Sequence, residues 1–312
     1  MAEETSVKEH DVVMIGAGPS ALAAAVYTTR ERIDTVLLEK GVIGGLAAIT
    51  DMIDNYPGFE KGIAGLELAQ KLQAQAERFG AKIELGEVTK ISLDGEKVKL
   101  DTSNGEYSAS AVLIATGSDY KKLGIPGEKE FYAKGVHYCA TCDGAFYKDK
   151  HVVVVGGGNS AVQEALFLTR FASKIDLLVR SELRASDVLV ERLEKEDKVT
   201  VHLGVTIDEI VGGEDGMVAK VIGTDSTTGE KREFPTDGVF VFIGLLPNTG
   251  FLAGSDIELD GRGFINTDAN LMTSMKGVFA SGDVRSGATM QIASAVGEGA
   301  TAALKIREYL ED

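Results

Sequence analysis

The sequence has little cysteine and little proline for its length. Its 312 residues include two Cys and five Pro, against 37 Gly. Collagen-like and linker sequences are rich in both Gly and Pro, so both classes are excluded. A hydrophobic content of 44% with 26% charged residues predicts a folded chain with a large buried core rather than a disordered one. The length suggests two domains.

Positive charge is also scarce, since 32 Lys and Arg face 48 Asp and Glu, for a net charge of −16. Nucleic acids and anionic membranes bind through Lys and Arg, so we expect neither as a partner. The acidic excess is explained most simply by solubility, with a salt-adapted host or a basic partner as alternatives. Apolar runs such as Val239–Leu246 are too short to span a bilayer. The polar segment Met1–His10 has no apolar core of a secretory signal, so we expect a cytoplasmic protein.

The two cysteines, Cys139 and Cys142, form one C-x-x-C that is followed by Asp143. Structural disulfides are rare in the cytoplasm, so this pair indicates redox chemistry. Its spacing allows the two sulfurs to bond on one helical turn or tight loop, and one thiol of such a pair is often a nucleophile. A carboxylate opposes the charge of an adjacent thiolate, so we assign Asp143 acid/base work rather than thiolate stabilisation.

A zinc site and a purely structural disulfide are the alternatives for this pair. Structural zinc needs four ligands, and only His137 lies close in sequence to the two cysteines. We therefore expect no metal site. His137 itself is interpreted as a packing or surface residue, and not as a base.

A first nucleotide-binding unit is predicted near the N-terminus. The apolar run Asp11–Ile15 is typical of a buried parallel strand. A Gly-rich turn, an Ala-rich helix over Ala21–Arg30, a second strand over Thr35–Leu38 and then Glu39 follow it. This order of strand, turn, helix, strand and acid is much more specific than the glycine spacing alone.

Each residue type in this unit has a physical reason. Gly16 permits the tight turn, Gly18 lets the backbone approach a pyrophosphate, and Ala21 allows helix and strand to pack closely. The N–H groups at the start of the helix attract phosphates. Glu39 lies 23 residues after Gly16, where a carboxylate binds ribose hydroxyls.

A second unit repeats the order about 140 residues later. The strand His151–Val155 is followed by Gly156-Gly157-Gly158-Asn159-Ser160-Ala161, a helix predicted over Val162–Phe171 and a strand over Ile175–Val179. Val179 stands where the first unit has Glu39, and Arg180 comes next. A missing acid beside an Arg favours a 2′-phosphate, hence NADP over NAD; the alternative is a solvated surface Arg.

Two such units suggest two dinucleotides, most simply a tightly held flavin and an exchangeable nicotinamide. The segments Ala111–Thr116 and Gly238–Ile243, which end at Gly117 and Gly244, are suited to close each unit. We therefore predict an α/β fold with two Rossmann-like dinucleotide-binding domains, the second inserted in the first: residues 118–246 lie between 1–117 and 247–312. The C-terminal part should add a strand and turn over Val278–Asp283 and a helix over Met290–Tyr309, whose N-terminus can face a cofactor.

Over nearly its whole length the chain resembles the low-molecular-weight thioredoxin reductases of bacteria and archaea. Besides the two Gly-rich turns, the matching motifs are Asn55-Tyr56-Pro57-Gly58, Ala115-Thr116-Gly117, Cys139-Ala140-Thr141-Cys142-Asp143 and Gly282-Asp283-Val284. The Cys pair inside the second nucleotide domain is the most specific of them. Related flavoenzymes of the glutathione reductase type are longer and carry their pair in the FAD domain.

The resemblance implies FAD on the first domain, NADPH or NADH on the second, a homodimer, and thioredoxin or a similar small redox protein as substrate. It also implies a swinging second domain, with Cys142 meeting the flavin and Cys139 attacking the substrate disulfide. The implied FAD residues are Gly16, Gly18, Pro19, Ser20, Ala21, Glu39, Gly45, Asn55, Val88, Ala115, Thr116, Gly117, Gly282, Asp283, Met290, Gln291 and Ile292. The implied nicotinamide-nucleotide residues are Gly156, Gly158, Asn159, Ser160, Ala161, Arg180 and Arg184.

Three departures from the family pattern bear on function. Leu46 stands where Gln is frequent, and Met290 replaces the Arg of an Arg-Gln pair. The usual His-Arg-Arg stretch reads Val179-Arg180-Ser181, and the segment up to Arg184 is one residue shorter. One Arg of the 2′-phosphate clamp is missing, which weakens the case for NADPH. Two rival functions stay open, although the intact second Gly-rich turn disfavours both: an enzyme of the same fold with ferredoxin as donor or a glutaredoxin-like acceptor, and a flavin-bound redox sensor.

Overall fold

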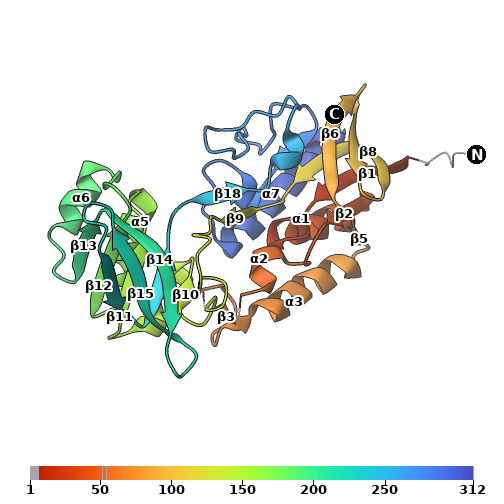
Figure 1. Ribbon diagram of the computed structural model, residues 1–312. Coiled ribbons are helices and arrows are strands. Elements are labelled where there is room, and N and C mark those ends of the chain that lie inside the picture. The colour runs from red at the N-terminus through yellow and green to blue at the C-terminus, as the bar shows by residue number, and fades with distance from the viewer. Residues whose placement is uncertain (1–6, 51, 54, 312) are drawn as a thin grey trace, which may run out of the picture. The chain divides into compact units, whose positions relative to one another are not determined.

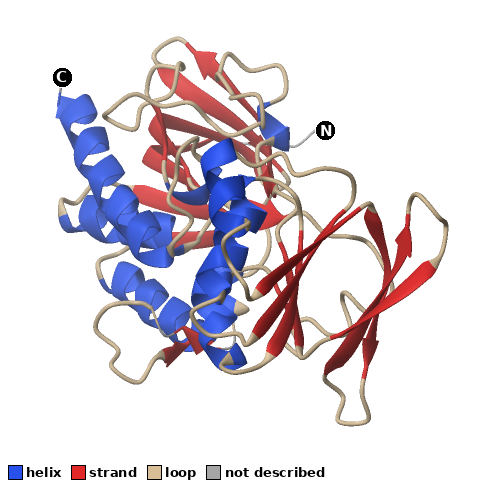
Figure 2. Ribbon diagram, turned by 90° about the vertical axis from the view of Figure 1, so that its left-hand side faces the viewer, coloured by secondary structure: helices blue, strands red, loops and turns tan. Residues whose placement is uncertain are grey.

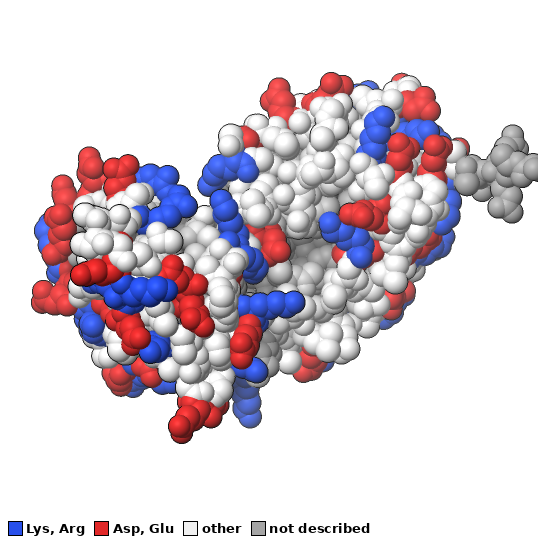
Figure 3. Space-filling model, viewed as in Figure 1, with Lys and Arg blue, Asp and Glu red and all other residues white. Residues whose placement is uncertain are grey.

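The computed structural model describes residues 7–50, 52–53 and 55–311. The chain divides into two compact units. The first consists of Met1–Asp119 and Leu246–Asp312, and the second of Tyr120–Leu245. Both units combine helices and strands (Figure 2). On the face shown in Figure 3, Lys and Arg side chains are interspersed with Asp and Glu.

The first unit is built on a sheet with the order β5-β2-β1-β8-β7-β6 (Figure 1). The long strand β8 has two partners on one side: its first half pairs with the hairpin strand β7, and its second half with β19, which comes from the C-terminal part of the chain. The parallel strands are β1 (Lys8–Ile15), β2 (Thr35–Glu39), β5 (Lys82–Leu85), β8 (Gly105–Ile114) and β19 (Val278–Ala280). The antiparallel strands are β6 (Val88–Asp94) and β7 (Lys97–Thr102).

Alternate residues of β1 separate two cores. Val12 and Met14 pack with the Ala-rich helix α1 (Pro19–Arg30) and with α7 (Ile292–Glu311). Val13 and Ile15 pack on the other face with the β6–β7 hairpin and the segment after β18 (Leu245–Pro247). This alternation is what a strand buried on both faces requires. The remaining elements of the unit are α2 (Gly45–Ala48), β3 (Met52–Ile53), β4 (Ile63–Ala64), α3 (Gly65–Arg78), η2 (Gly250–Leu252) and η3 (Gly282–Val284).

The second unit has a parallel sheet with the order β10-β17-β11-β12-β13. Helices cover one face of it, and a small antiparallel sheet covers the other. Its parallel strands are β10 (Val136–His137), β11 (His151–Val155), β12 (Lys174–Val179), β13 (Val199–Leu203) and β17 (Gly238–Val241). The covering elements are α5 (Asn159–Leu168), α6 (Asp187–Leu193), β14 (Val205–Gly212), β15 (Val218–Asp225) and β16 (Lys231–Pro235).

The two chain segments that connect the units, β9 (Ser118–Tyr120) and β18 (Leu245–Pro247), pair with each other as a two-stranded sheet. The boundaries between the two units lie between residues 119 and 120 and between residues 245 and 246. The sequence predicts them one or two residues away, between 117 and 118 and between 246 and 247.

Several element ends differ from the sequence-based expectation. Helix α5 begins at Asn159, directly after the Gly-rich turn, and ends at Leu168 instead of Phe171. The last helix begins at Ile292 rather than Met290. Met290 has a φ of +58°, a left-handed conformation that a right-handed helix cannot include.

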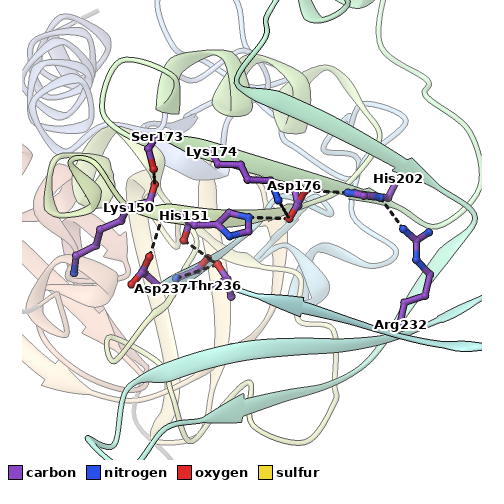
Figure 4. A network of polar contacts seen from close by, with 10 residues as sticks. Lys150, His151, Ser173, Lys174, Asp176, His202, Arg232, Thr236 and Asp237 are labelled. Carbon is purple, nitrogen blue, oxygen red and sulfur yellow. Dashed lines mark hydrogen bonds and ion pairs between the residues drawn. The ribbon is translucent and has the colours of Figure 1, made fainter.

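A buried carboxylate ties the layers of the second unit together (Figure 4). Asp176 on β12 is 3% exposed, and its oxygens accept hydrogen bonds from His151 Nε2 (2.7 Å) and His202 Nε2 (2.9 Å). Arg232 of β16 donates to His202 Nδ1 over 2.9 Å. Burial alone would raise the pKa of the Asp176 carboxyl, but the two imidazoles and the Lys174 ammonium outweigh it and hold that pKa below its usual value.

Replacing Asp176 with Ala should lower the free energy of unfolding by about 3–5 kcal/mol at neutral pH, because the variant leaves buried donors without their shared acceptor. The folded-state pKa is lower than the unfolded one. The contribution is therefore complete above about pH 4 and is lost as the pH falls through the folded-state value. Urea unfolding followed by circular dichroism measures both effects.

The exposed Asp197 gives the control, and Asp197→Ala should change the free energy by no more than about 0.5 kcal/mol. Equal losses in the two variants would contradict a structural role for the Asp176 network.

Candidate functional site

The first Gly-rich turn leaves the N-terminus of α1 open. Gly16 has a φ of +99°, and a Cβ there would lie 2.6 Å from the Ala115 carbonyl oxygen, so only Gly fits. A Cβ on Gly18 would have no atom within 4 Å. No side chain caps α1, and its first turn contains no acid. Its leading N–H groups therefore remain available for a phosphate.

Glu39 lies beside this turn, at the end of β2. Its carboxylate accepts hydrogen bonds from the Ala17 N–H (2.8 Å) and the Gly41 N–H (2.7 Å), which fix its orientation while leaving lone pairs for ribose hydroxyls. The Gly44 N–H donates to the Ala17 carbonyl over 2.8 Å. An ideal Cβ on Gly45 would lie 3.9 Å from Gly18 Cα. The structure thus brings Glu39 and Gly45 to the first turn.

Val88 and the Ala115–Gly117 segment border the same region. The Gly86 N–H donates to the Glu39 carbonyl over 2.8 Å, which places the start of β6 at Val88 next to the end of β2. The Ala115 N–H donates to the Ile15 carbonyl over 2.9 Å. Thr116 and Gly117 are held by Asn248, whose backbone N–H donates to the Gly117 carbonyl over 3.0 Å. Sequence reasoning missed Asn248, which carries no motif of its own.

The C-terminal part of the chain reaches the start of α1 from the other side. Ser20 Oγ and Ser281 Oγ are 2.7 Å apart, and a Cβ on Gly282 would lie 3.2 Å from Ser20 Cβ. Asp283 follows in η3. Burial, and then the charge of Glu298, raise the pKa of the Asp283 carboxyl to about 6. In the part of the chain that the structure describes, this half-buried carboxyl has no hydrogen-bond partner. It is therefore available to bond a hydroxyl group of a ligand.

The N-terminus of α7 meets the loop that follows β3. Asn55 Nδ2 donates to Gln291 Oε1 over 3.1 Å, and an open cavity of about 610 Å³ is lined by residues 55–60. Met290 carries the left-handed φ noted above, directly before Gln291 and Ile292. Residues of this kind in strained conformations cluster at functional sites.

These features fit the FAD that the family resemblance implies. The turn offers an uncapped helix N-terminus and an open space at Gly18 for a pyrophosphate, and Glu39 is oriented by two N–H groups. Among the described residues the Asp283 carboxyl has no hydrogen-bond partner. The first unit thus offers a phosphate site at the start of α1 and polar groups from β2 and η3 beside it.

The second Gly-rich turn repeats the geometry without the acid. Gly156 has a φ of +142°, and a Cβ there would overlap the Phe242 carbonyl oxygen, whereas Gly158 faces open space. Asn159 does not cap α5, because its Oδ1 accepts from the Ser186 N–H over 2.8 Å. The Arg184 N–H donates to the Gly157 carbonyl over 2.7 Å. The segment 180–186 therefore lies against the turn.

Arg180 and Arg184 are both exposed on that segment. Among the described residues neither has an ion pair with a carboxylate, Glu182 included. Both guanidinium groups are therefore available to an anionic group of a ligand bound at the turn.

Cys139 and Cys142 form a disulfide in the second unit, with their Cα atoms 5.3 Å apart. Cys139 is the N-cap of the short helix α4 (Ala140–Asp143), and the Cys142 N–H donates to Cys139 Sγ over 3.2 Å. Both residues are half-buried. The helix continues into η1 (Gly144–Tyr147) and then into β11, the strand of the second Gly-rich turn.

Asp143 closes α4, and its N–H donates to the Cys139 carbonyl over 3.1 Å. Its carboxylate Oδ2 lies 3.1 Å from His137 Nδ1. Sequence reasoning interpreted His137 as a packing or surface residue. Its ring does stack on Phe240 with centroids 5.1 Å apart, but it also contacts the acid beside the disulfide.

The described residues contain no group of three or more His, Cys, Asp or Glu side chains that could hold a metal ion. No helix within those residues is long and apolar enough to cross a membrane.

Comparison with known proteins places this arrangement in a family. The model of the pyridine nucleotide-disulphide oxidoreductases matches residues 10–299. A thioredoxin reductase of Bacillus subtilis is 44% identical over 314 residues, covering 100% of this chain and 97% of that protein. The crystal structure of thioredoxin reductase from Streptococcus pyogenes is 40% identical with a TM-score of 0.91, covering 98% of this chain and 99% of the other. Thioredoxin reductase from Giardia duodenalis is 32% identical with a TM-score of 0.92, covering 98% and 100%.

The chain therefore belongs to the pyridine nucleotide-disulphide oxidoreductase family and, within it, to the thioredoxin reductases. The resemblance and the α/β fold with two Rossmann-like units that the sequence predicts are confirmed. Membership of this family implies the use of FAD and of a pyridine nucleotide.

Purified protein should be yellow and carry about one FAD per chain, and Glu39→Gln should weaken FAD binding roughly 10- to 100-fold. The reason is that a hydrogen bond to a charged acceptor contributes about 1.5–3 kcal/mol. Titration of the flavin-free protein with FAD, followed by absorbance, measures the dissociation constant. Glu87→Gln, at an exposed position near the end of β2, should bind FAD as the parent does. A folded, colourless preparation that takes up no FAD would contradict the assignment of an FAD site to the first unit.

Proposed function

We propose that this chain is a thioredoxin-disulfide reductase that passes electrons from NAD(P)H through FAD and the Cys139–Cys142 disulfide to thioredoxin or a similar small redox protein. The observation that carries the proposal is a closed C-x-x-C disulfide in the second nucleotide unit, next to Asp143. The relatives named thioredoxin reductases support the same activity.

Each unit would hold one nucleotide. The FAD would lie on the first unit, within the proposed domain 1–117 and 247–312, with its phosphates at Gly16 and Gly18 and its ribose hydroxyls at Glu39. The nicotinamide nucleotide would lie at Gly156 and Gly158, in the proposed domain 118–246. When bound, the flavin supplies a two-electron carrier between the nicotinamide and the disulfide.

The chemistry of the cysteine pair is a thiol–disulfide exchange. Two electrons and two protons convert the closed pair to two thiols. The Cys139 thiolate then attacks the substrate disulfide and forms a mixed disulfide, which the Cys142 thiolate resolves. Each of the two substrate sulfurs released takes up one proton, so two electrons and two protons pass to the substrate. Asp143 would carry protons at this site, since it ends the helix that holds both sulfurs.

NADPH is the proposed donor rather than NADH. Val179 gives no carboxylate for a free 2′-hydroxyl, and the exposed Arg180 and Arg184 lie on the segment bonded to the second turn. The absence of an Arg180–Glu182 ion pair leaves Arg180 available for a 2′-phosphate.

We also infer a homodimer and a cytoplasmic location. The family resemblance implies the homodimer, and the first unit exposes large apolar side chains at Val42 (55%), Ile49 (52%) and Leu66 (53%), which an interface between two copies could cover. Sedimentation velocity would measure the first inference and cell fractionation the second. A monomer, or the protein in a membrane fraction, would contradict them.

Cys139→Ser and Cys142→Ser should each abolish thioredoxin reduction while reduction of the bound flavin by NADPH persists, because that earlier step does not use the sulfurs. Steady-state turnover with thioredoxin and stopped-flow flavin absorbance measure the two steps. Thr141→Ser, between the two cysteines, should keep most of the turnover. Near-normal turnover in either Cys variant would contradict the proposal. A wild type that binds FAD but does not turn over would favour a redox sensor.

Arg180→Ala should lower kcat/KM for NADPH by roughly 10- to 100-fold and leave that for NADH unchanged, because one charge-assisted bond to the 2′-phosphate is lost. Arg192→Ala on α6 is the matched control. Equal use of both nucleotides, unaffected by the substitution, would refute the phosphate role. No reaction with either one, in a protein with intact flavin, would point to a donor such as ferredoxin.

A further inference from the structure

His137 connects a buried tyrosine to the acid beside the disulfide. Its Nδ1 lies 3.1 Å from Asp143 Oδ2, and its Nε2 lies 2.6 Å from the Tyr147 hydroxyl. The His137 and Asp143 side chains are 11% and 21% exposed, and Tyr147 is 5% exposed. These three side chains are largely buried, and they lie in the segment 137–147, which contains the Cys pair.

The fold holds the imidazole in one orientation. His137 ends β10, which pairs in parallel with β17 so that His137 is opposite Phe240. The ring stacks on Phe240, and the Tyr147 ring packs edge-on against both, with centroids 5.3 Å from His137 and 5.2 Å from Phe240. A Cβ on Gly238 would lie 2.8 Å from the Tyr147 hydroxyl. The absence of a side chain at Gly238 therefore makes room for the phenol.

Tyr147 keeps its proton at all working pH values. Burial, and then the carboxylates of Asp143 and Asp237, raise the pKa of the Tyr147 hydroxyl well above its usual range. A protonated phenol can both donate and accept a hydrogen bond. It is therefore a neutral anchor for His137 Nε2, whichever protonation state the imidazole has.

The pair of His137 and Asp143 can take up or release a proton without losing a hydrogen bond. An ionised Asp143 accepts from Nδ1–H, while Nε2 accepts from Tyr147. An imidazolium donates to both neighbours. If the proton moves to Asp143, the carboxyl donates to Nδ1 and Nε2–H donates to Tyr147.

The other charged groups near the pair are few. Asp237 acts on Tyr147 and is bonded to the His151 N–H over 2.9 Å. The Lys150 ammonium lies 5.6 Å from the centre of the Tyr147 ring. Glu164 comes from α5, which packs on α4, and burial raises the pKa of its carboxyl. None of these groups bonds His137 in the described part of the chain, so Asp143 is its acidic partner.

We propose that His137 is a positioning residue that orients the Asp143 carboxyl and supplies it with a proton during thiol–disulfide exchange at Cys139 and Cys142. The proposal rests on the proposed redox role of the cysteine pair and adds a residue to it. In the exchange, a Cys thiolate attacks a substrate disulfide, one S–S bond forms and one breaks, and the departing thiolate takes the proton of Asp143. That proton is the one that Asp143 and His137 Nδ1 share, and the pair regains it from solvent through the His137 ring. The electron pair stays with the departing sulfur.

The test uses the holoprotein with its Cys pair reduced by dithiothreitol and freed of reductant, so that neither thioredoxin nor a nicotinamide is needed. The reduced pair then reacts with one of two disulfides. Hydroxyethyl disulfide releases an alkyl thiolate, which needs a proton to leave, whereas the aromatic dithiobis(nitrobenzoate) releases a thiolate that leaves unprotonated. Alkylation quench and mass spectrometry give the rate of Cys139–Cys142 closure. His137→Asn should slow the alkyl reaction about tenfold or more near neutral pH and leave the aromatic one nearly unchanged. The pH dependence of the alkyl reaction should also change in this variant, and that of the aromatic reaction should not.

Two further variants keep the outcome unambiguous. His10→Asn, which alters a His–carboxylate pair of the first unit (His10 Nδ1 to Asp34 Oδ2, 2.8 Å), should leave both rates as in the wild type. Tyr147→Phe keeps the packed ring, removes only the hydroxyl, and should give a smaller loss with the alkyl disulfide alone. Equal slowing with both disulfides in His137→Asn would show a merely structural role, and no slowing with either would show no role. A wild-type pair that closes normally in this assay, in a protein that does not reduce thioredoxin, would reject the proposed function and leave the role of His137 standing.

Discussion

The close approach of backbone to backbone at the two Gly-rich turns is the constraint on which the rest of the structure depends. At Gly16 and Gly156 a Cβ would meet the carbonyl oxygen of a segment that follows the neighbouring parallel strand, so each turn can form only without a side chain. Once formed, each turn directs an uncapped helix N-terminus toward open space at Gly18 or Gly158. The Ala-rich α1 follows from the same constraint, because only small side chains let it pack this closely on β1 and α7.

The two units share this geometry and differ in what surrounds it. In the first, Glu39 and Asp283, whose carboxyl has no hydrogen-bond partner among the described residues, provide acceptors near the start of α1. In the second, the acid is replaced by Val179 and two exposed Arg residues, and the Cys pair precedes β11. The two units thus have the same backbone geometry at the turn but different polar groups around it. Because one chain carries both nucleotide-binding units and the Cys pair, it has the sites that a transfer of electrons from a nicotinamide to a flavin and then to a disulfide requires.

The sequence predicts the features that depend on a particular residue type at a particular spacing. A turn with no room for a Cβ requires Gly, and a redox-active pair of this kind has the spacing C-x-x-C. The two strand–turn–helix units, Glu39 and the Cys pair were all accessible in this way. Contacts made only by tertiary packing were not. Asn248, which holds Thr116 and Gly117, lies beside the paired strands β9 and β18. The link from Tyr147 through His137 to Asp143 depends on β10 pairing with β17. No local pattern in the sequence encodes either pairing. The start of the last helix was misplaced because Met290 adopts a left-handed φ, which a Met residue rarely does.

The proposed path of electrons requires that the bound flavin and the Cys139–Cys142 disulfide exchange two electrons. Anaerobic reductive titration with dithionite, followed by flavin absorbance, tests it without reference to any nicotinamide or protein substrate. The wild type should take up about four electrons per chain, two for the flavin and two for Cys139–Cys142, and Cys142→Ser should take up about two. A wild type that takes up about two electrons, with its disulfide still closed when the flavin is fully reduced, would exclude this exchange.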